Sequence, residues 1–511
     1  MMKKGGCISS KPNIIIIMTD QQRADVSRRE GFALDTTPFL DSMARQGGWF
    51  NHAYTSTPIC APARTSMFTG RFPNATRVRD NHALGHVVYE KDLIGVLSEK
   101  GYLKALIGKN HSHVRDVDFD YCFGLGHNRG TRFNCPEGDK FDMWRYKLRA
   151  SVSLEPTPFP LKYQGPCMAV SEAQKWVKSV KKKPFFLWLT LPEPHNPYQV
   201  PEPYFSIFPT EKLPPTRTDS RVLKKKGFKW EWTKYIEERA FPGYEKHLPR
   251  VRSNYFGMLR LIDDQIKRFV EFLEKENLRK NTIIIFLSDH GDFVGEYGLM
   301  RKGPEMPNML MRIPLFFTGP GIKACRTPHK AHVSIVDVMP TLCDALGVPF
   351  PRGVQGRSLW PMLTGKKYPG EEFKSVYAEQ GIGGLHYTRD DKPEKNYERF
   401  GGTLNTGRPN FDELNSCSQS GMMRMVRKGD WKLTFDMQGN GQLYNLSNDP
   451  AELKNLYGNP GYSKIQSEML AELLAWTLRA QDPLPMPNLY TMKTDPRNYW
   501  AKYRSNKNKS A

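Results

Sequence analysis

The run Asn13-Ile14-Ile15-Ile16-Ile17-Met18-Thr19 indicates the fold class of this chain. A short, β-branched apolar run is typical of a strand that is buried on both faces of a parallel sheet. Similar runs recur, and two stretches between them, 112–165 and 196–250, lack this pattern and are predicted to be irregular insertions. We therefore predict an α/β fold in which helices sandwich a large, mixed but mostly parallel sheet. The further predicted strands are residues 103–107, 184–190, 282–287 and 314–318.

The pattern of apolar runs changes past about residue 370. Short strand-like runs separated by turns are followed by a helical pattern over residues 463–479. This order is typical of a small antiparallel sheet with a covering helix. We predict a large α/β domain over residues 12–368, a smaller C-terminal α+β subdomain over 369–482, and a Pro-rich basic tail over 483–511.

The charge balance of the 511 residues is strongly basic. Lys and Arg total 75 against 53 Asp and Glu, which gives a net charge of +22. Such a balance favours polyanionic partners, namely nucleic acid, an anionic membrane surface, or a sulfated or phosphorylated substrate. Solvated surface lysines explain it equally well. Because the sequence has no zinc-knuckle or RNP-type motif, we expect no nucleic-acid partner.

The eight cysteines are scattered and show no CxxC spacing, so they suggest neither a zinc site nor a disulfide framework. No apolar stretch is long enough for a membrane span, and the early run 14–18 is too short for the core of a signal peptide. The sequence as written therefore predicts either a cytoplasmic protein or one whose leader is missing from this sequence. Cys7 lacks the apolar stretch that a lipoprotein signal would place before it.

Polar side chains follow four of the predicted strands at the point where each strand ends. Because ligands collect at the carboxyl ends of parallel strands, we expect these side chains to meet at one edge of the sheet. Alone, each has a structural explanation such as a turn or a helix cap. Together they predict a single site. The residues are, in chain order, Asp20, Gln21, Lys109, His111, His195, Asp289 and His290.

The types of these residues suit a divalent cation. Asp20 and Asp289 offer hard carboxylate oxygens, Gln21 can add a carbonyl oxygen, and His290 can add an imidazole nitrogen. A cation held there would bind an oxygen of an anionic substrate.

The remaining polar residues suit an anion and its proton transfers. Lys109 and Lys302 could hold the oxygens of the anion, as cationic clamps do for phosphoryl groups. His111 and His195 are candidates for acid and base roles near neutral pH.

The stretch Cys60-Ala61-Pro62-Ala63-Arg64 predicts an anion-binding site with a sulfur at a helix start. Pro62 fits the first turn of a helix, where its missing N–H costs nothing. Cys60 then lies at the helix N-terminus, which favours an anionic group. Arg64 lies about one turn further on and can reach back to the same place.

Cys-x-Pro-x-Arg followed by Thr69-Gly70-Arg71 resembles the signature of the formylglycine-dependent (type I) sulfatases of the alkaline phosphatase superfamily. The resemblance implies an alkaline phosphatase-like fold for the large domain. It also implies that Cys60 is oxidised to formylglycine by a formylglycine-generating or anaerobic sulfatase-maturating enzyme. The hydrate of this aldehyde would be the nucleophile. If a leader is missing, the resemblance implies a periplasmic or secreted protein.

The family's functional residues match this sequence position by position. The resemblance implies one divalent cation. We expect Ca²⁺, with Mn²⁺ or Mg²⁺ as alternatives. Two ligands depart from the common pattern, because many members have Asp in place of Gln21 and Asn in place of His290. The implied metal ligands are Asp20, Gln21, Cys60, Asp289 and His290. The implied catalytic residues are Cys60, Arg64, Lys109, His111, His195 and Lys302.

We therefore expect a sulfatase, exo-acting on a sulfated carbohydrate such as a glycosaminoglycan fragment. Arg77, Arg79, Asn81 and His82 lie just beyond the nucleophile helix and either line a sugar pocket or only shape the loop. A phosphonate monoester or phosphodiester hydrolase of the same superfamily is one alternative. The other, from a different class, is a non-catalytic polyanion-binding protein with an unmodified Cys60.

Overall fold

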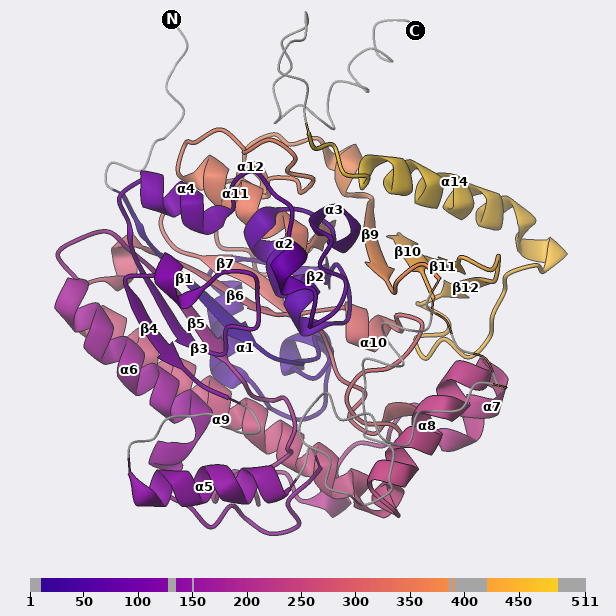
Figure 1. The fold of residues 1–511 in the computed structure, drawn as a ribbon, viewed down its shortest axis with the longest axis horizontal. Coiled ribbons are helices and arrows are strands. Elements are labelled where there is room, and N and C mark those ends of the chain that lie inside the picture. The colour runs from indigo at the N-terminus through magenta and orange to yellow at the C-terminus, as the bar shows by residue number, and fades with distance from the viewer. Residues whose placement is uncertain are drawn as a thin grey trace, which may run out of the picture.

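The computed structural model of the protein contains two sheets, one of eight strands and one of four. Helices cover the large sheet, and the small sheet lies to one side of it beneath helix α14 (Ser463–Arg479; Figure 1). This arrangement confirms the predicted α/β class with a smaller antiparallel sheet. The described residues are 11–126, 135–148, 151–384, 386, 388, 390 and 421–485.

The large sheet is centred on the isoleucine-rich strand β1. This strand pairs in parallel with β5 on one side and with β6 on the other, and its four isoleucines are fully buried. Only β7 runs against its neighbours, so the sheet is mixed but mostly parallel, as predicted. The strands in order across the sheet are β4 (Tyr121–Gly124), β3 (Leu103–Gly108), β5 (Phe185–Leu191), β1 (Asn13–Thr19), β6 (Thr282–Ser288), β7 (Leu315–Thr318), β2 (Gly48–Tyr54) and β8 (His329–Ser334).

Successive side chains of β1 point to opposite faces and therefore into two separate cores. Ile14 and Ile16 pack with helices α2, α4 and α11, whereas Ile15 and Ile17 pack with α1, α6 and α9. A strand covered on both faces needs a continuous apolar run, and this explains the sequence of β1. The helices are α2 (Cys60–Thr69), α4 (Leu93–Glu99), α11 (Val338–Ala345), α1 (Pro38–Arg45), α6 (Gly165–Val180) and α9 (Leu248–Lys275).

The small sheet has the predicted antiparallel arrangement. Helix α14 covers one face, where the ring of Trp476 stacks on that of Tyr377 with centroids 5.8 Å apart. The domain division after residue 368 stays a prediction, and most of the predicted tail, residues 486–511, lies outside the described residues. The strands in order are β12 (Gly441–Asn445), β11 (Trp431–Asp436), β10 (Met423–Lys428) and β9 (Ser375–Gln380).

The two predicted irregular insertions contain regular elements. The first holds the edge strand β4 and helix α5 (Pro136–Lys147), and the second holds helices α7 (Leu223–Lys226) and α8 (Phe228–Ala240). Strand β4 is only four residues long and partly exposed, so it has no continuous apolar run. In α5 and α8 charged and aromatic residues are interspersed, so no clear apolar stripe marks a helix.

Strands β2 and β8 were also not predicted from the sequence. Polar residues such as Asn51, His52 and Lys330 interrupt their apolar residues. The structure also contains three short helices, α3 (Pro73–Thr76), α10 (Asn308–Met311) and α12 (Trp360–Leu363).

The described part of the chain contains neither a disulfide nor a helix suited to a membrane. Its six cysteines are free, while Cys7 and Cys417 lie outside the described residues. The longest helix, α9, has 28 residues. Charged residues recur along it, and no described helix combines the length and the apolar character that crossing a bilayer requires.

We predict that Gly108→Ala destabilises the protein. Gly108 ends β3 with φ +118°, and a Cβ there would overlap the carbonyl oxygen of Thr190 on β5. The substitution should force the two strands apart and cost about 3 kcal/mol, lowering the Tm measured by thermal denaturation. Gly124→Ala is the matched control, because Gly124 pairs with Gly108 across β3 and β4 and a Cβ there meets nothing within 4 Å. Equal losses in both variants would contradict the explanation.

Candidate active site

Four neighbouring parallel strands, β3, β5, β1 and β6, deliver polar residues to one edge of the large sheet. Backbone hydrogen bonds continue the sheet just past the strand ends and so hold these residues in place. The N–H of Lys109 donates to the carbonyl of Thr190 at 3.0 Å, and the N–H of Asp289 donates to that of Thr19 at 3.3 Å. Asp20 is held in the same way against β5, by the carbonyl of Glu193 at 3.3 Å.

Cys60 is the first residue of helix α2, as predicted, with Pro62 in the first turn. All ten residues of α2 are buried, and the residue before the helix, Ile59, offers no capping side chain. The side chain of Asn81 serves instead, because its Oδ1 accepts a hydrogen bond from the N–H of Ala61 at 3.0 Å. The loop after α2 therefore helps to hold the start of the helix that carries Cys60.

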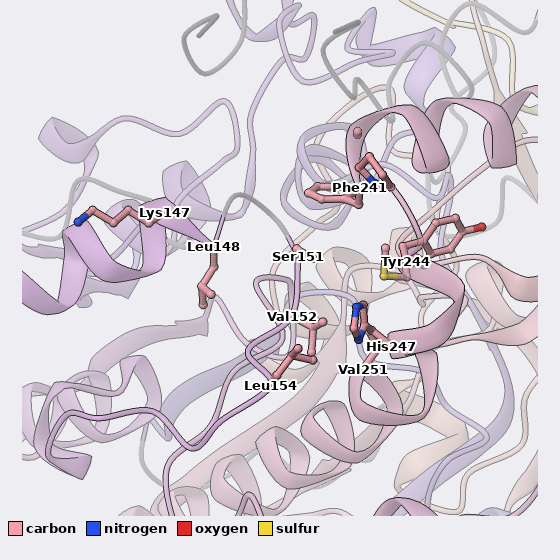
Figure 2. A pocket seen from close by; sticks show the side chains of 12 residues that line it. Lys147, Leu148, Ser151, Val152, Leu154, Phe241, Tyr244, His247 and Val251 are labelled. Atoms are coloured by element: carbon pink, nitrogen blue, oxygen red, sulfur yellow. The ribbon is translucent and has the colours of Figure 1, made fainter. Parts of the chain in front are cut away.

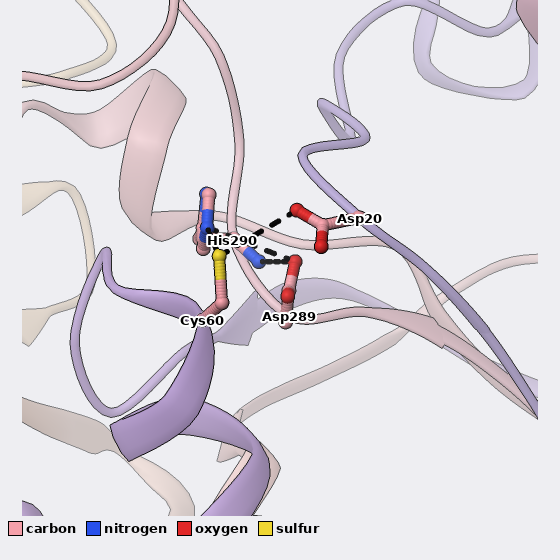
Figure 3. A group of neighbouring side chains, drawn as sticks. All are labelled: Asp20, Cys60, Asp289 and His290. Carbon is pink, nitrogen blue, oxygen red and sulfur yellow. Dashed lines mark hydrogen bonds and ion pairs between the residues drawn. The ribbon is translucent and has the colours of Figure 1, made fainter. Parts of the chain in front are cut away.

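The sulfur of Cys60 lies among the predicted metal ligands (Figure 3). Its Sγ is 3.2 Å from Nε2 of His290 and 3.6 Å from Oδ1 of Asp20. Nζ of Lys302 lies 3.5 Å from the same sulfur. One ligand atom each from Asp20, Cys60, Asp289 and His290 can be chosen so that all lie within 4.8 Å of one another.

Arg64 links the aspartates of two adjacent strands. Its Nη2 donates to Asp20 and its Nε to Asp289, both at 2.9 Å. Its Nη1 donates to the carbonyl of Lys109 at 2.8 Å and to the hydroxyl of Thr190 at 3.0 Å. The guanidinium is completely buried, so these contacts fix α2 against the strand ends.

Gln21 presents an oxygen that fits a cation. Its Nε2 donates to Oδ2 of Asp292 at 2.6 Å, which directs the amide, and its backbone is left-handed with φ 66°. Its Oε1 is buried and finds no hydrogen-bond partner among the described residues. A buried carbonyl oxygen without a partner is costly unless a ligand satisfies it. Together with the neighbouring carboxylates and imidazole, this oxygen forms a donor set that suits a divalent cation.

Asp20 remains ionised although it is fully buried. Burial alone would raise its pKa, but Lys109, His195 and Arg64 surround it, and their charges hold the pKa well below its usual range. Lys109 also forms a direct ion pair with Asp20. The site therefore combines two buried carboxylates with cationic side chains around Cys60.

The two predicted acid–base histidines lie near this cluster. Burial, followed by the charges of Lys109 and Arg64, lowers the pKa of His111 well below its usual range, so its imidazole is neutral at pH 7. Its Nδ1 is buried without a hydrogen-bond partner in the described structure. His195 is buried as well, with Nδ1 2.7 Å from the carbonyl oxygen of Asn196.

The four predicted substrate-binding residues are placed differently from one another. Asn81 is half-buried and bonded to helix α2, whereas Arg77 and His82 are exposed and Arg79 is half-buried. Asp292 was not predicted from the sequence, although it lies three residues after Asp289 and accepts hydrogen bonds from both Gln21 and Tyr198. The pair of acidic residues in Asp289-His-Gly-Asp292 was the available signal.

A comparison with protein families shows the family of this chain. The Sulfatase family model matches residues 12–348, which is more than half of the chain and includes every residue of the cluster around Cys60. The chain belongs to the sulfatase family. It is a sulfuric ester hydrolase, and the non-catalytic alternative is set aside. The family implies a divalent cation and formylglycine, and the cluster of Asp20, Cys60, Asp289 and His290 is a possible metal site.

Individual proteins resemble this sulfatase along most of its length. An arylsulfatase of Clostridium perfringens is 27% identical over 502 residues, which covers 92% of this chain and 95% of the relative. A delta 4,5-hexuronate-2-O-sulfatase of Bacteroides thetaiotaomicron is 25% identical over 501 residues, with coverage of 92% and 90%. The crystal structure of a phosphonate monoester hydrolase of Agrobacterium radiobacter shares the fold, with a TM-score of 0.74 at 20% identity and coverage of 92% and 96%.

A separate hollow of about 370 Å³ opens elsewhere on the sulfatase (Figure 2). Phe241, Tyr244 and His247 form one side, and the segment from Ser151 to Leu154 forms the other. None of the predicted site residues lines it. It is therefore distinct from the cluster around Cys60.

We predict that the sulfatase binds one divalent cation per chain and that Asp289→Asn weakens this binding. Loss of a carboxylate from the donor set should lower the affinity at least about tenfold, the effect typical even of an outer-shell partner. Metal content after gel filtration, measured by inductively coupled plasma mass spectrometry, tests this. Asp116→Asn, an exposed aspartate outside the cluster, should leave the content unchanged. Wild-type metal content in Asp289→Asn would contradict the assignment.

Proposed function

We propose that this sulfatase removes sulfate from a sulfated carbohydrate, acting on the end of a glycosaminoglycan or other sulfated polysaccharide fragment. The observation that carries the proposal is the position of Cys60, between the Asp20–Asp289–His290 cluster and the ammonium of Lys302. A relative that shares 25% identity over most of the chain is named a hexuronate sulfatase, which supports a sugar substrate. The net charge of +22 favours an anionic carbohydrate.

Two groups implied by the family would supply the reactive chemistry. Cys60 is the position of formylglycine, whose hydrate would provide the nucleophilic oxygen near the place of Sγ. The residues that would hold the cation are Asp20, Gln21, Asp289 and His290. The cation, for which we expect Ca²⁺, would stabilise negative charge on the sulfate and the nucleophile.

The chain's own side chains bind the sulfate group and move the protons. Lys109 and Lys302 bind sulfate oxygens, and Arg64 orients the start of the nucleophile helix. His195 donates a proton to the departing sugar oxygen. His111 is neutral at pH 7 and accepts the proton that leaves residue 60 when sulfate is released.

We predict that Cys60 is modified and that Cys60→Ala is inactive. Oxidation of the thiol to the aldehyde lowers the mass of the peptide that contains residue 60 by about 18 Da, which mass spectrometry of a tryptic digest measures. Cys60→Ala should lose all measurable sulfate ester hydrolysis and keep its Tm, because a small apolar residue suits the buried helix start. An unmodified cysteine together with full activity in the wild type would overturn the assignment.

We predict that the cost of His195→Asn depends on the leaving group. A general acid is needed most when the leaving oxygen is basic, so kcat/KM should fall about 10²–10⁴-fold for an alkyl or sugar sulfate and far less for p-nitrophenyl sulfate. Lys302→Met is the contrast, because loss of a sulfate-binding group should affect both esters equally. A uniform loss in His195→Asn would rule out the acid role.

The substrate class is tested by comparing defined sulfated saccharides with p-nitrophenyl sulfate. We predict a higher kcat/KM for at least one saccharide, and we predict that Arg79→Ala raises KM for the saccharide but not for the aryl ester. Activity on the aryl ester alone would contradict a carbohydrate substrate.

A phosphonate monoester or phosphodiester hydrolase is the second candidate. The TM-score of 0.74 to a phosphonate monoester hydrolase supports it at the level of the fold. Gln21 also supports it. With an amide at this position the cation site has one carboxylate fewer than in many sulfatases, so the site carries less negative charge to repel a phosphonate. The ratio of kcat/KM for matched sulfate and phosphonate esters separates the two reactions.

A further inference from the structure

Lys302 lies in a strained loop, residues 301–307, which we call the Lys302 loop. Lys302 is 0% exposed, and its Nζ points at Cys60. Three non-glycine residues of this loop have left-handed backbones, Arg301 with φ 62°, Glu305 with φ 67° and Met306 with φ 51°. Each such residue costs about 1–3 kcal/mol and persists only when its surroundings hold it. The contacts of this loop therefore decide where the ammonium lies.

A buried ion pair from the C-terminal part of the chain holds the end of the Lys302 loop. Lys432 of β11 is 1% exposed and pairs with Glu452. Its Nζ donates to the carbonyl of Met306 at 2.6 Å. Oε2 of Glu452 accepts a hydrogen bond from the N–H of Asn308 at 2.7 Å. The pair thus fixes the backbone on both sides of Pro307.

Glu305 gives the loop a second attachment to the same region. Its Oε2 accepts hydrogen bonds from Nε1 of Trp230 in α8 at 2.6 Å and from Nε2 of Gln442 in β12 at 2.7 Å. Lys226 of α7 lies over the ring of Trp230, 4.7 Å from its centroid, and donates to the carbonyl of Glu452 at 2.9 Å. Helices α7 and α8 and the small sheet therefore enclose the Lys302 loop from one side.

We propose that the buried Lys432–Glu452 pair is a positioning device that holds Lys302 where it binds the sulfate group. Taking two charges out of water costs several kcal/mol per ion, so such a pair is a poor means of stabilising a fold. Its contacts with the backbone of 306 and 308 give it a different use, which is to impose one conformation on a strained loop. The inference rests on the proposed role of Lys302. Neither residue contacts Cys60, so both act through Lys302.

The test removes both charges of the pair, so that no buried charge is left alone. Lys432→Met/Glu452→Gln should bind inorganic sulfate about tenfold more weakly, as measured by the rise of Tm with sulfate concentration. It should also lower kcat/KM by the same factor for aryl and sugar sulfates, since Lys302 binds the group that they share. A Tm loss without these changes would show a purely structural role and would overturn the proposal.

A control pair, more exposed than the Lys432–Glu452 pair, exists in the same small sheet. Lys428 of β10 pairs with Glu472 of α14 at 3.2 Å, away from the Lys302 loop. Lys428→Met/Glu472→Gln should keep sulfate affinity within about twofold of the wild type. A loss as large as that of the Lys432–Glu452 variant would mean that any change to this sheet weakens the site, and the proposal would fail.

Combining the pair variant with Lys302→Met distinguishes a failure of the positioning proposal from a failure of the proposed role of Lys302. In the Lys302→Met background, removal of the Lys432–Glu452 pair should cause no further loss of sulfate affinity, because interacting residues are not additive. A full additional tenfold loss would overturn the positioning role. If Lys302→Met alone binds sulfate like the wild type, the proposed role of Lys302 is wrong instead. Should the pair variant not fold, Glu305→Ala, at a half-buried position, loosens the same loop and must show the same sulfate-specific loss.

Discussion

The site depends on one buried guanidinium. Arg64 holds Asp20 from the end of β1 and Asp289 from the end of β6, each at 2.9 Å, and so fixes helix α2 across the two strand ends. Because Cys60 begins that helix, the same contacts determine where the proposed nucleophile lies. Removing one member of such a network leaves a buried charge without a partner and costs about 3–5 kcal/mol. The position of the reactive group and the stability of the central sheet are therefore coupled.

The two sheets contribute to the site in different ways. The large sheet supplies Asp20 and Asp289 directly, from strand ends that are rigid because their backbone groups remain paired. The small sheet supplies no residue to the cluster around Cys60, yet Lys432 binds the backbone of the loop that carries Lys302. The aspartates at the strand ends are held by the paired backbone and by Arg64, whereas the strained loop that carries Lys302 is held by contacts from outside the large sheet. Under the proposed positioning role, the small sheet of this protein acts on the site through the Lys302 loop.

Local sequence signals predicted the parts of the structure that depend on local chemistry. The isoleucines of β1, the polar residue after each strand and Pro62 in the first turn of α2 were each recognisable within a few residues. The long-range contacts that hold the site in place were not recognisable. Asn81 bonds to Ala61, and Lys432 bonds to Met306, through contacts that no local pattern records. Edge strands such as β4 were missed because partial exposure removes their apolar run.

The burial of Cys60 has a consequence for the order of events during synthesis. Its side chain is 1% exposed in the folded protein, beneath groups that β1 and β6 hold in place. Strand β6 ends at Ser288, so the strand ends beside the thiol cannot come together until that residue has been synthesised. At about 5–20 residues per second, translation of the roughly 230 intervening residues takes on the order of 10–50 s. A maturation enzyme of the kind that the family implies would have at least this interval, set by the sequence separation of two strands, in which to reach the thiol.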